Sequence, residues 1–259
     1  MKKYAVCSLL SVLVICFNTY ATFNEKRLGE LLSLEHSDTI PTLSKREIGM
    51  SAAAHESTPA QPSGPFYPIT LPDESDSDLT VVGRGLSAAG VAVYVQGRVM
   101  NTDGEPLARA VVEIWQACQS GKYRHPSDSN PAVADPYFQY YASTTINADG
   151  YFIFKTIVPG PYPASGNWMR PPHIHFLITL PGYKTLVTQM YFDGNSFPEV
   201  VATVGGKSVD GSVINQLNQL DFLLQKISAE RQKSLITSFN LHPGAQIKTG
   251  TFDIYLQKQ

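Results

Sequence analysis

The stretch Arg170-Pro-Pro-His-Ile-His-Phe-Leu-Ile-Thr-Leu180 contains an apolar, β-branched run that begins with two histidines two residues apart. Such a run predicts a β-strand, and residues two apart on a strand point to the same face. His173 and His175 would then offer both imidazoles on one side, which is half of a metal site. Two half-buried histidines satisfied by hydrogen bonds would give the same pattern, so the neighbouring residues have to decide.

A second stretch just upstream, Pro159-Gly-Pro-Tyr-Pro163, contains a different kind of metal donor. Zinc and ferrous sites usually take a carboxylate or a cysteine as a further ligand, and residues 159–180 contain neither. They do contain Tyr162, held between two prolines, and the cation Arg170. A phenol ionises unaided only near pH 10, so a tyrosine ligand suits ferric iron better than most divalent ions.

The composition favours a turn-rich β protein. The chain has 259 residues, a formal net charge of −2 and 43% hydrophobic residues, which suits one sizeable domain plus extensions. Only 16% of residues are charged, while glycine and proline number 19 and 18. The chain has no excess of basic residues, so its charge does not indicate a nucleic-acid partner.

Short alternating or β-branched segments, separated by turns such as Asn101-Thr-Asp-Gly104, predict most of the secondary structure. The expected strands are 91–99, 110–117, 143–146, 151–157, 173–180, 185–192 and 252–256. Only residues 216–236 keep helical spacing, with Leu217, Leu220, Leu223 and Leu224 as the apolar positions. The expected fold is therefore all-β, a β-sandwich of mixed sheets with few short helices.

Residues 1–21 read as a secretory signal peptide, with Lys2 and Lys3 ahead of an apolar segment from Ala5 to Phe17. This segment is too short to cross a bilayer comfortably. We therefore expect an exported protein, periplasmic or secreted, without stable membrane insertion once the leader is cleaved. A retained transmembrane anchor is the alternative.

Residues 22–63 read as an extension with one helix at 25–34 and an Ala, Ser, Pro and Gln-rich linker or wrapping arm at 51–63. The domain proper is expected at 64–259. Two of the three cysteines lie in the leader, so Cys118 is left alone and is expected to be a small buried hydrophobic residue.

A further donor should come from another loop at the same end of the sandwich. Tyr123, in Gln119-Ser-Gly-Lys-Tyr-Arg-His125, is the best candidate, and His125 competes with it. A tyrosine at a strand end is more often a packing residue, so Tyr123 taken alone does not establish a metal ligand.

Several motifs, in order along residues 64–256, together resemble the intradiol ring-cleavage dioxygenases, particularly the protocatechuate 3,4-dioxygenase branch. The motifs are Gly64-Pro-Phe-Tyr67, Val112-Glu-Ile-Trp-Gln-Ala117, Gly121-Lys-Tyr-Arg-His125, Asp135-Pro-Tyr-Phe138, Thr156-Ile-Val-Pro-Gly-Pro-Tyr-Pro163, Arg170-Pro-Pro-His-Ile-His-Phe176, Thr188-Gln-Met-Tyr-Phe192 and Phe252-Asp-Ile-Tyr-Leu256. Jointly and at this spacing they are far more specific than any one of them.

The resemblance implies one non-haem Fe(III) ion per chain, with Tyr123 and His173 as equatorial ligands and Tyr162 and His175 as axial ligands. It implies a catechol-type substrate that chelates the iron as a dianion and displaces Tyr162, which can accept a proton. Dioxygen then attacks the activated ring, and a cis,cis-muconate results. An oligomer, homo- or hetero-, is expected.

The resemblance also assigns roles outside the ligand set. Arg170 would steady carbanion-like charge on the ring, although a surface or interface ion pair is the plainer alternative. Gln189 would lie next to the ligands and assist the iron site, although an outward-facing strand amide is possible. Trp115 is assigned to the substrate pocket, and a position in the core is the alternative.

One departure from the family pattern concerns the pocket wall. Protocatechuate enzymes commonly carry a tryptophan two residues after the axial tyrosine, where this chain has Ala164, so the preferred ring substituent stays open.

The sequence also leaves two rival functions open. One is a secreted β-sandwich binding module without turnover, and the other is a hydrolytic zinc enzyme that uses His173 and His175.

Overall fold

The computed structural model describes residues 54–259 except 74, 84 and 85. The predicted signal peptide at 1–21 and the predicted helix at 25–34 lie outside the described residues. The strands are β1 (Ala92–Asn101), β2 (Val111–Trp115), β3 (Tyr141–Thr145), β4 (Tyr151–Ile157), β5 (Tyr162–Ser165), β6 (Trp168–Arg170), β7 (His173–Thr179), β8 (Leu186–Phe192), β9 (Ala202–Val204), β10 (Lys207–Val209), β11 (Ile236–Thr237), β12 (Phe239–Asn240), β13 (Lys248–Thr251) and β14 (Ile254–Leu256).

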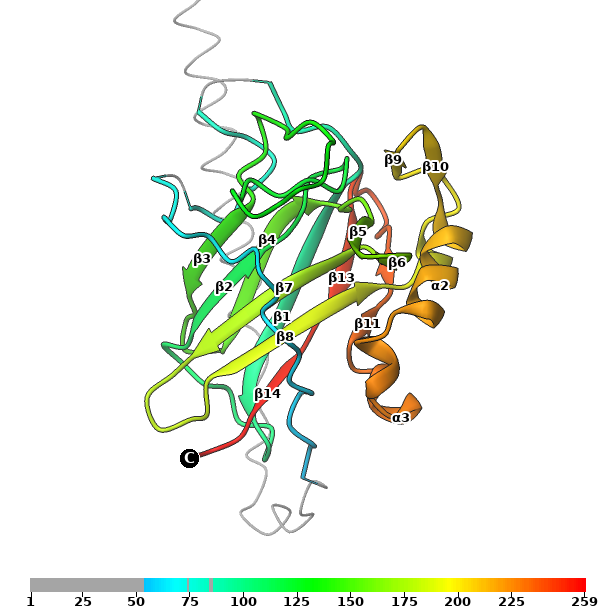
Figure 1. Cartoon of the computed structure of the whole chain (residues 1–259). Coiled ribbons are helices and arrows are strands. Elements are labelled where there is room, and N and C mark those ends of the chain that lie inside the picture. Colours follow the sequence, from blue (N-terminus) through cyan, green and yellow to red (C-terminus); the bar gives the residue numbers. More distant parts are fainter. Residues whose placement is uncertain (1–53, 74, 84–85) are drawn as a thin grey trace, which may run out of the picture. The chain divides into compact units, whose positions relative to one another are not determined.

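Two mixed five-stranded sheets form the body of the protein (Figure 1). In the first sheet β1 pairs with β13 and β14 in parallel and with β4 in antiparallel, and β12 joins at β13. The second sheet has the order β11-β8-β7-β2-β3. Phe176 of β7 lies 6.0 Å from Phe152 of β4 and 5.0 Å from Phe252, measured between ring centroids, so the two inner faces share one core. The predicted all-β sandwich is confirmed.

The predicted strands match observed ones wherever alternation was long. Strands β1, β4, β7 and β8 agree with the predicted segments to within one or two residues. The hairpin β5–β6 and the short strands β9 to β13 were not predicted, because segments of two to four residues carry too little periodicity to be detected. Within the described residues, no helix combines the length and the apolar character that crossing a bilayer requires.

The prediction of one helix over residues 216–236 is wrong. Helix α2 runs earlier, over Gly211–Leu220, because the Asp210 side chain accepts a hydrogen bond from Val213 N (3.1 Å) and caps it. The chain becomes extended at Asp221 (ψ 116°). Two short helices follow, the 3-10 helix η2 (Leu224–Lys226) and α3 (Ala229–Gln232); another 3-10 helix, η1 (Gly194–Ser196), lies further upstream. The leucine spacing continues past Asp221, but the Asp221 side chain binds Arg170 in another part of the fold, and the helix ends there.

Residues 58–67, here called the N-terminal strap, run from β14 of the first sheet along β8 of the second sheet without forming a strand (Figure 1). Thr58 N donates to Tyr255 O (3.0 Å), and Gln61 N donates to Val187 O (2.9 Å). The Thr188 hydroxyl donates to Pro59 O (2.7 Å). The sequence left a linker or a wrapping arm open for residues 51–63, and their described portion wraps along the sandwich.

Candidate metal centre

Strand β7 presents its two histidines on the face opposite the core. Ile174 and Phe176 are fully buried between the sheets, so His173 and His175 point to the other side, where they are also buried. Their Nε2 atoms lie 3.2 Å apart. Two nitrogens bound at right angles to one metal, each about 2.1 Å from it, would be separated by about 3.0 Å. The spacing of this pair therefore suits two ligands of one ion.

The tautomer of His173 also suits a metal ligand. Its Nδ1–H donates to Pro171 O (2.7 Å), which leaves the lone pair on Nε2. Burial, followed by the positive charge of Arg170, lowers the pKa of both imidazoles well below the ordinary value. Both rings are therefore neutral at pH 7, as a ligand must be. His175 Nδ1 is buried and makes no hydrogen bond.

Two glycines let the two tyrosine-bearing loops pack in direct contact. A Cβ at Gly121, where φ is +79°, would lie 2.3 Å from Pro161 O, and a Cβ at Gly160 would lie 2.3 Å from Gln119 O. Both glycine amides donate to Cys118 O (2.9 and 3.0 Å). Any side chain at either glycine would separate the loops. Cys118 is buried as predicted.

The loops bring Tyr123 and Tyr162 beside the histidines. The two tyrosine rings are 5.3 Å apart between centroids and nearly perpendicular, at 89°. Tyr162 lies 5.6 Å from the His173 ring, and Tyr123 lies 6.3 Å from the His175 ring. The structure thus brings together all four side chains that the sequence singled out as ligands, two from strand β7, one from the start of strand β5 and one from the loop that follows β2.

The protonation of the two phenols differs from that of ordinary tyrosines. Burial first, and then the neighbouring Tyr162, raises the pKa of Tyr123 well above the usual value. Burial also raises the pKa of Tyr162, and the nearby charge of Arg170 opposes this shift. The buried Tyr123 hydroxyl makes no hydrogen bond of normal geometry. A buried hydroxyl without such a bond, beside two neutral imidazoles, fits the role of a metal ligand.

The donor set fits ferric iron better than zinc. Two phenolates would neutralise two of the three charges of Fe(III), and two imidazoles complete a four-ligand set that a small diol can extend. Among residues 54–259 with the three exceptions above, no group of three or more His, Cys, Asp or Glu side chains could hold a metal. The hydrolytic zinc alternative therefore finds no ligand group of its usual kind in the described part.

His125 competed with Tyr123 as a candidate ligand. Its Nδ1 accepts a hydrogen bond from Ser127 N (3.1 Å).

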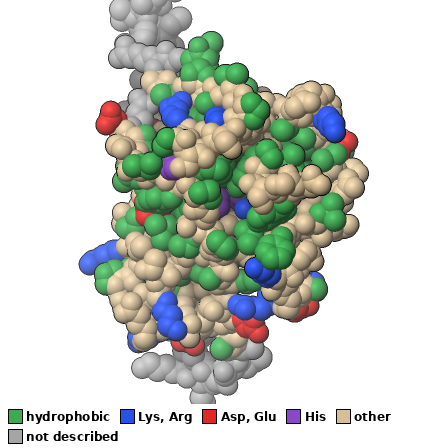
Figure 2. Space-filling view, viewed as in Figure 1, with side chains coloured by type: hydrophobic (Ala, Val, Ile, Leu, Met, Phe, Trp, Pro, Cys, Tyr) green, Lys and Arg blue, Asp and Glu red, His purple; other side chains and the backbone are tan. Residues whose placement is uncertain are grey.

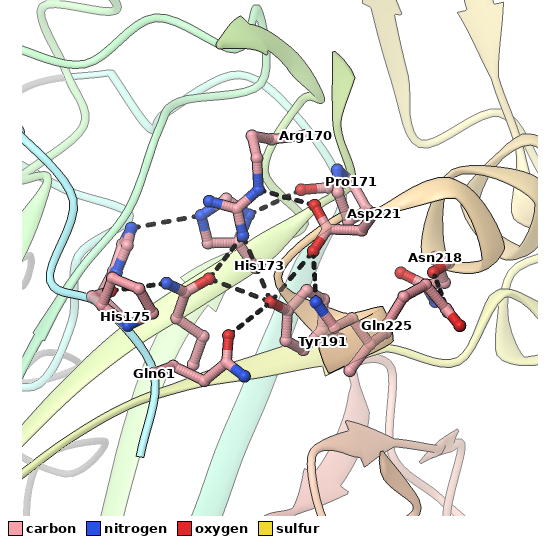
Figure 3. A network of polar contacts seen from close by, with 12 residues as sticks. Gln61, Arg170, Pro171, His173, His175, Tyr191, Asn218, Asp221 and Gln225 are labelled. Carbon is pink, nitrogen blue, oxygen red and sulfur yellow. Dashed lines mark hydrogen bonds and ion pairs between the residues drawn. The ribbon is translucent and has the colours of Figure 1, made fainter. Parts of the chain in front are cut away.

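Arg170 is buried beside these ligands and is held by a network of polar side chains (Figure 3). Its Nε donates to Asp221 Oδ2 (2.8 Å), and its Nη2 donates to Gln189 Oε1 and to the Tyr191 hydroxyl (3.3 Å). Strand pairing explains the cluster, because Gln189 lies opposite His175 and Tyr191 lies opposite His173 on β8. The pairing of Arg170 with Tyr162 across β5–β6 turns the guanidinium toward the same place.

Sequence reasoning missed three members of this network, Gln61, Tyr191 and Asp221. Tyr191 lies two residues after Gln189, so strand alternation alone places it on the ligand face, and that signal was available. Asp221 carried no such signal, because it lay inside the predicted helix. Gln61 lay in the predicted extension. Asp221 reaches Arg170, and Gln61 reaches Tyr191, only through the folding of distant segments.

Aromatic side chains surround the ligands. Trp115 stacks on His175 with centroids 4.7 Å apart and planes 5° apart, and Tyr67 meets the Trp115 ring edge-on at 5.0 Å. Phe66 of the strap packs on Tyr123 at 4.6 Å. Trp115 is buried and fixes the orientation of a candidate ligand, while its wider assignment to the substrate pocket stays a prediction. Hydrophobic side chains also gather around the middle of the face in Figure 2, where a histidine and a basic side chain show between them.

Truncating Asp221 to alanine should destabilise the protein by about 3–5 kcal/mol, because the change leaves the buried Arg170 guanidinium without its carboxylate. Urea unfolding measures this change. Glu199→Ala is the matched control, since the Glu199–Lys248 ion pair is partly exposed and its loss should cost less than about 1 kcal/mol. Equal losses in the two variants would contradict a buried, charged Arg170–Asp221 pair.

Comparison with known proteins identifies the family. A protein family described as Dioxygenase matches residues 63–256. The protocatechuate 3,4-dioxygenase beta chain of Burkholderia cepacia is 40% identical over 125 residues, 46% of this chain and 53% of that protein. Catechol 1,2-dioxygenase 2 of Acinetobacter lwoffii is 31% identical over 164 residues, 58% of this chain and 57% of that protein. The chain thus spans little more than half the length of these relatives.

Solved structures agree with this assignment. The dioxygenase domain of a dioxygenase and carbohydrate-binding protein fusion from Streptomyces sp. SirexAA-E superimposes with a TM-score of 0.54 at 26% identity, over 79% of this chain and all of that chain. 3-Chlorocatechol 1,2-dioxygenase from Rhodococcus opacus 1CP shares the fold, with a TM-score of 0.57 at 20% identity over 97% of each chain. This chain belongs to the intradiol ring-cleavage dioxygenase family.

Proposed function

We propose that this chain is a non-haem Fe(III)-dependent intradiol dioxygenase that cleaves the ring of protocatechuate or a related catechol with O2 to a cis,cis-muconate. The observation that carries the proposal is the convergence of Tyr123, Tyr162, His173 and His175 beside the buried Arg170 network. Ferric iron bound by these residues would supply the Lewis acidity that activates a chelated catechol. The family's relatives act on several catechols, so the ring substituent is the finer part of the proposal.

The protein residues have separate tasks in this reaction. The nearby charge of Arg170 favours loss of the Tyr162 phenol proton, so Tyr162 can serve as a phenolate ligand and accept a proton from an arriving diol. Arg170 presents a fixed positive charge toward the position of the substrate ring. Its two donor edges are already oriented by Asp221 and Gln189, so little reorganisation accompanies the reaction. The surrounding aromatic rings exclude water.

Oxygen uptake against a panel of catechols tests the proposal directly. We expect uptake of one O2 per ring cleaved with protocatechuate, catechol or hydroxyquinol, and incorporation of both atoms of labelled dioxygen into the two new carboxyl groups of an acyclic product. A ferric-loaded protein that binds catechols but consumes no oxygen with any of them would favour the alternative, a secreted binding module that keeps the family frame. Export through a signal peptide at 1–21, and assembly into a homo- or hetero-oligomer, also belong to the proposal.

Iron loading should release protons, and its affinity should rise with pH. Tyr123 and Tyr162 have raised pKa values and so keep their protons at pH 7, while His173 and His175 have lowered pKa values and have none to lose. Binding two phenolates therefore releases about two protons from the protein near neutral pH, so acidification weakens binding. Calorimetry with a ferric chelate in buffers of different ionisation enthalpy counts these protons. Tyr162→Phe should release one proton fewer, and an unchanged count would exclude Tyr162 as a phenolate ligand.

A further inference from the structure

Two residues of the N-terminal strap, Gln61 and Pro62, contact the arginine network from just before the region that matches the family. The family match begins at residue 63, and Gln61 and Pro62 precede it. Gln61 is nonetheless buried, with only 6% of its surface exposed. Its backbone N is fixed to Val187 O (2.9 Å) on β8, two residues before Gln189. The strap therefore holds both residues close to the residues that contact Arg170.

Gln61 determines where the hydroxyl proton of Tyr191 points. Three acceptors surround that hydroxyl, namely Gln61 Oε1 at 3.1 Å, Gln189 Oε1 at 3.2 Å and Asp221 Oδ1 at 3.4 Å. A phenol has one proton to donate. Donation to Gln61, at the shortest of the three distances, leaves Gln189 Oε1 to accept from Arg170 Nη2 and leaves Asp221 Oδ1 to accept from Leu224 N (2.8 Å). It also leaves the lone pairs of the Tyr191 oxygen free to accept from Arg170 Nη2 (3.3 Å).

Pro62 determines the direction of the Gln189 amide. Gln189 Nε2 donates to Pro62 O (2.7 Å), so its Oε1 must point the opposite way, toward Arg170. The Pro62 carbonyl belongs to the backbone of the strap, so its position depends on how the strap lies on β8. Without this acceptor the amide could turn and present N–H groups to the guanidinium, which would repel it.

Resting on the proposed function, we infer that Gln61 and Pro62 are positioning residues of the active site. They act through Tyr191 and Gln189, and they hold Arg170 in the orientation that the reaction uses. The part of the strap that precedes the family match is therefore part of the catalytic machinery. A packing role alone would require only the shape of the Gln61 side chain, whereas a positioning role requires its acceptor oxygen.

Two substitutions of similar size separate these roles in the full-length protein. Gln61→Met keeps the length of the side chain and removes the acceptor, whereas Gln61→Glu keeps an acceptor oxygen whether or not it is ionised. Gln139→Met is the control, because Gln139 is equally buried, at 4% exposed, and its Nε2 donates to Asp76 O (3.0 Å) and Tyr141 O (2.8 Å), away from Arg170. Each variant is loaded with ferric ion and assayed by visible absorption and by oxygen uptake with protocatechuate and catechol.

We expect Gln61→Met to keep the ferric absorption band, to lower kcat about five- to tenfold, as loss of one buried hydrogen bond implies, and to change KM less than about threefold. Gln61→Glu should restore at least half of the lost kcat on a logarithmic scale, and Gln139→Met should keep wild-type kcat. The inference is overturned if Gln61→Met has the wild-type kcat. It is also overturned if Gln61→Met and Gln61→Glu lose kcat to the same extent, or if both fail to fold. A wild-type protein without the ferric band would overturn the proposed function instead.

Discussion

Replacing Tyr123 with phenylalanine should weaken the ferric absorption band and lower kcat at least about 100-fold. The band expected for this donor set is a tyrosinate-to-iron charge transfer, so it depends on the phenolate oxygens and on no other group of the protein. Loss of one residue that merely supports a metal ligand already costs roughly 10- to 100-fold, and loss of a ligand should exceed that. The Tyr123 hydroxyl has no hydrogen bond of normal geometry to lose, so the fold should be little affected.

Tyr162→Phe should weaken the band as well, and Tyr141→Phe is the control for both changes. Tyr141 is a buried tyrosine of the same aromatic cluster, and its hydroxyl donates to Glu113 instead of facing the histidines. We expect Tyr141→Phe to keep the colour of the ferric protein. Unchanged colour in both Tyr123→Phe and Tyr162→Phe would show that the ligands have been assigned wrongly.

Replacing Arg170 with methionine should keep the ferric band and lower kcat about 100- to 1,000-fold, the usual effect of removing one preorganised charged donor from a buried site. Arg170→Lys should restore little of this loss. The guanidinium donates from Nε to Asp221 and from Nη2 to Gln189 and Tyr191, and an ammonium group cannot reproduce these two edges. Kinetics with a ferric-loaded enzyme and a titration of the band with catechol separate turnover from substrate binding.

Arg124→Met is the matched control for this series. Arg124 is exposed, lies over the Tyr140 ring at 4.8 Å and donates to Asp135 O (3.1 Å), so its loss should leave kcat within about twofold of wild type. If Arg170→Met and Arg170→Lys both turned over at wild-type rates with iron bound, the guanidinium would have no part in the chemistry. The network around it would then serve only the fold.

The sandwich could be predicted from the sequence because its long strands alternate. His173 and Ile174 lie on opposite faces of β7, and that alternation predicted both the core and the histidine pair. The two tyrosines required more than periodicity. Their meeting depends on Gly121 and Gly160, which allow a close approach of two loops that no local pattern describes.

The remaining parts of the site could not be predicted because their partners are distant in the chain. The leucine spacing predicted a helix through Asp221, but that residue ends α2, and its carboxylate accepts from Arg170 and from Leu224 N (2.8 Å) instead. Gln61 lies in a stretch whose composition reads as a linker, and it becomes buried only because the strap follows β8. Side chains whose role depends on a tertiary contact leave no periodic signal.

The visible spectrum of the wild-type protein, loaded with one equivalent of ferric ion and freed of excess, tests the central claim most directly. We predict a broad charge-transfer band that gives a red to burgundy colour and shifts when a catechol is added. A protein that retains the bound iron and stays colourless would contradict the claim that Tyr123 and Tyr162 hold the metal.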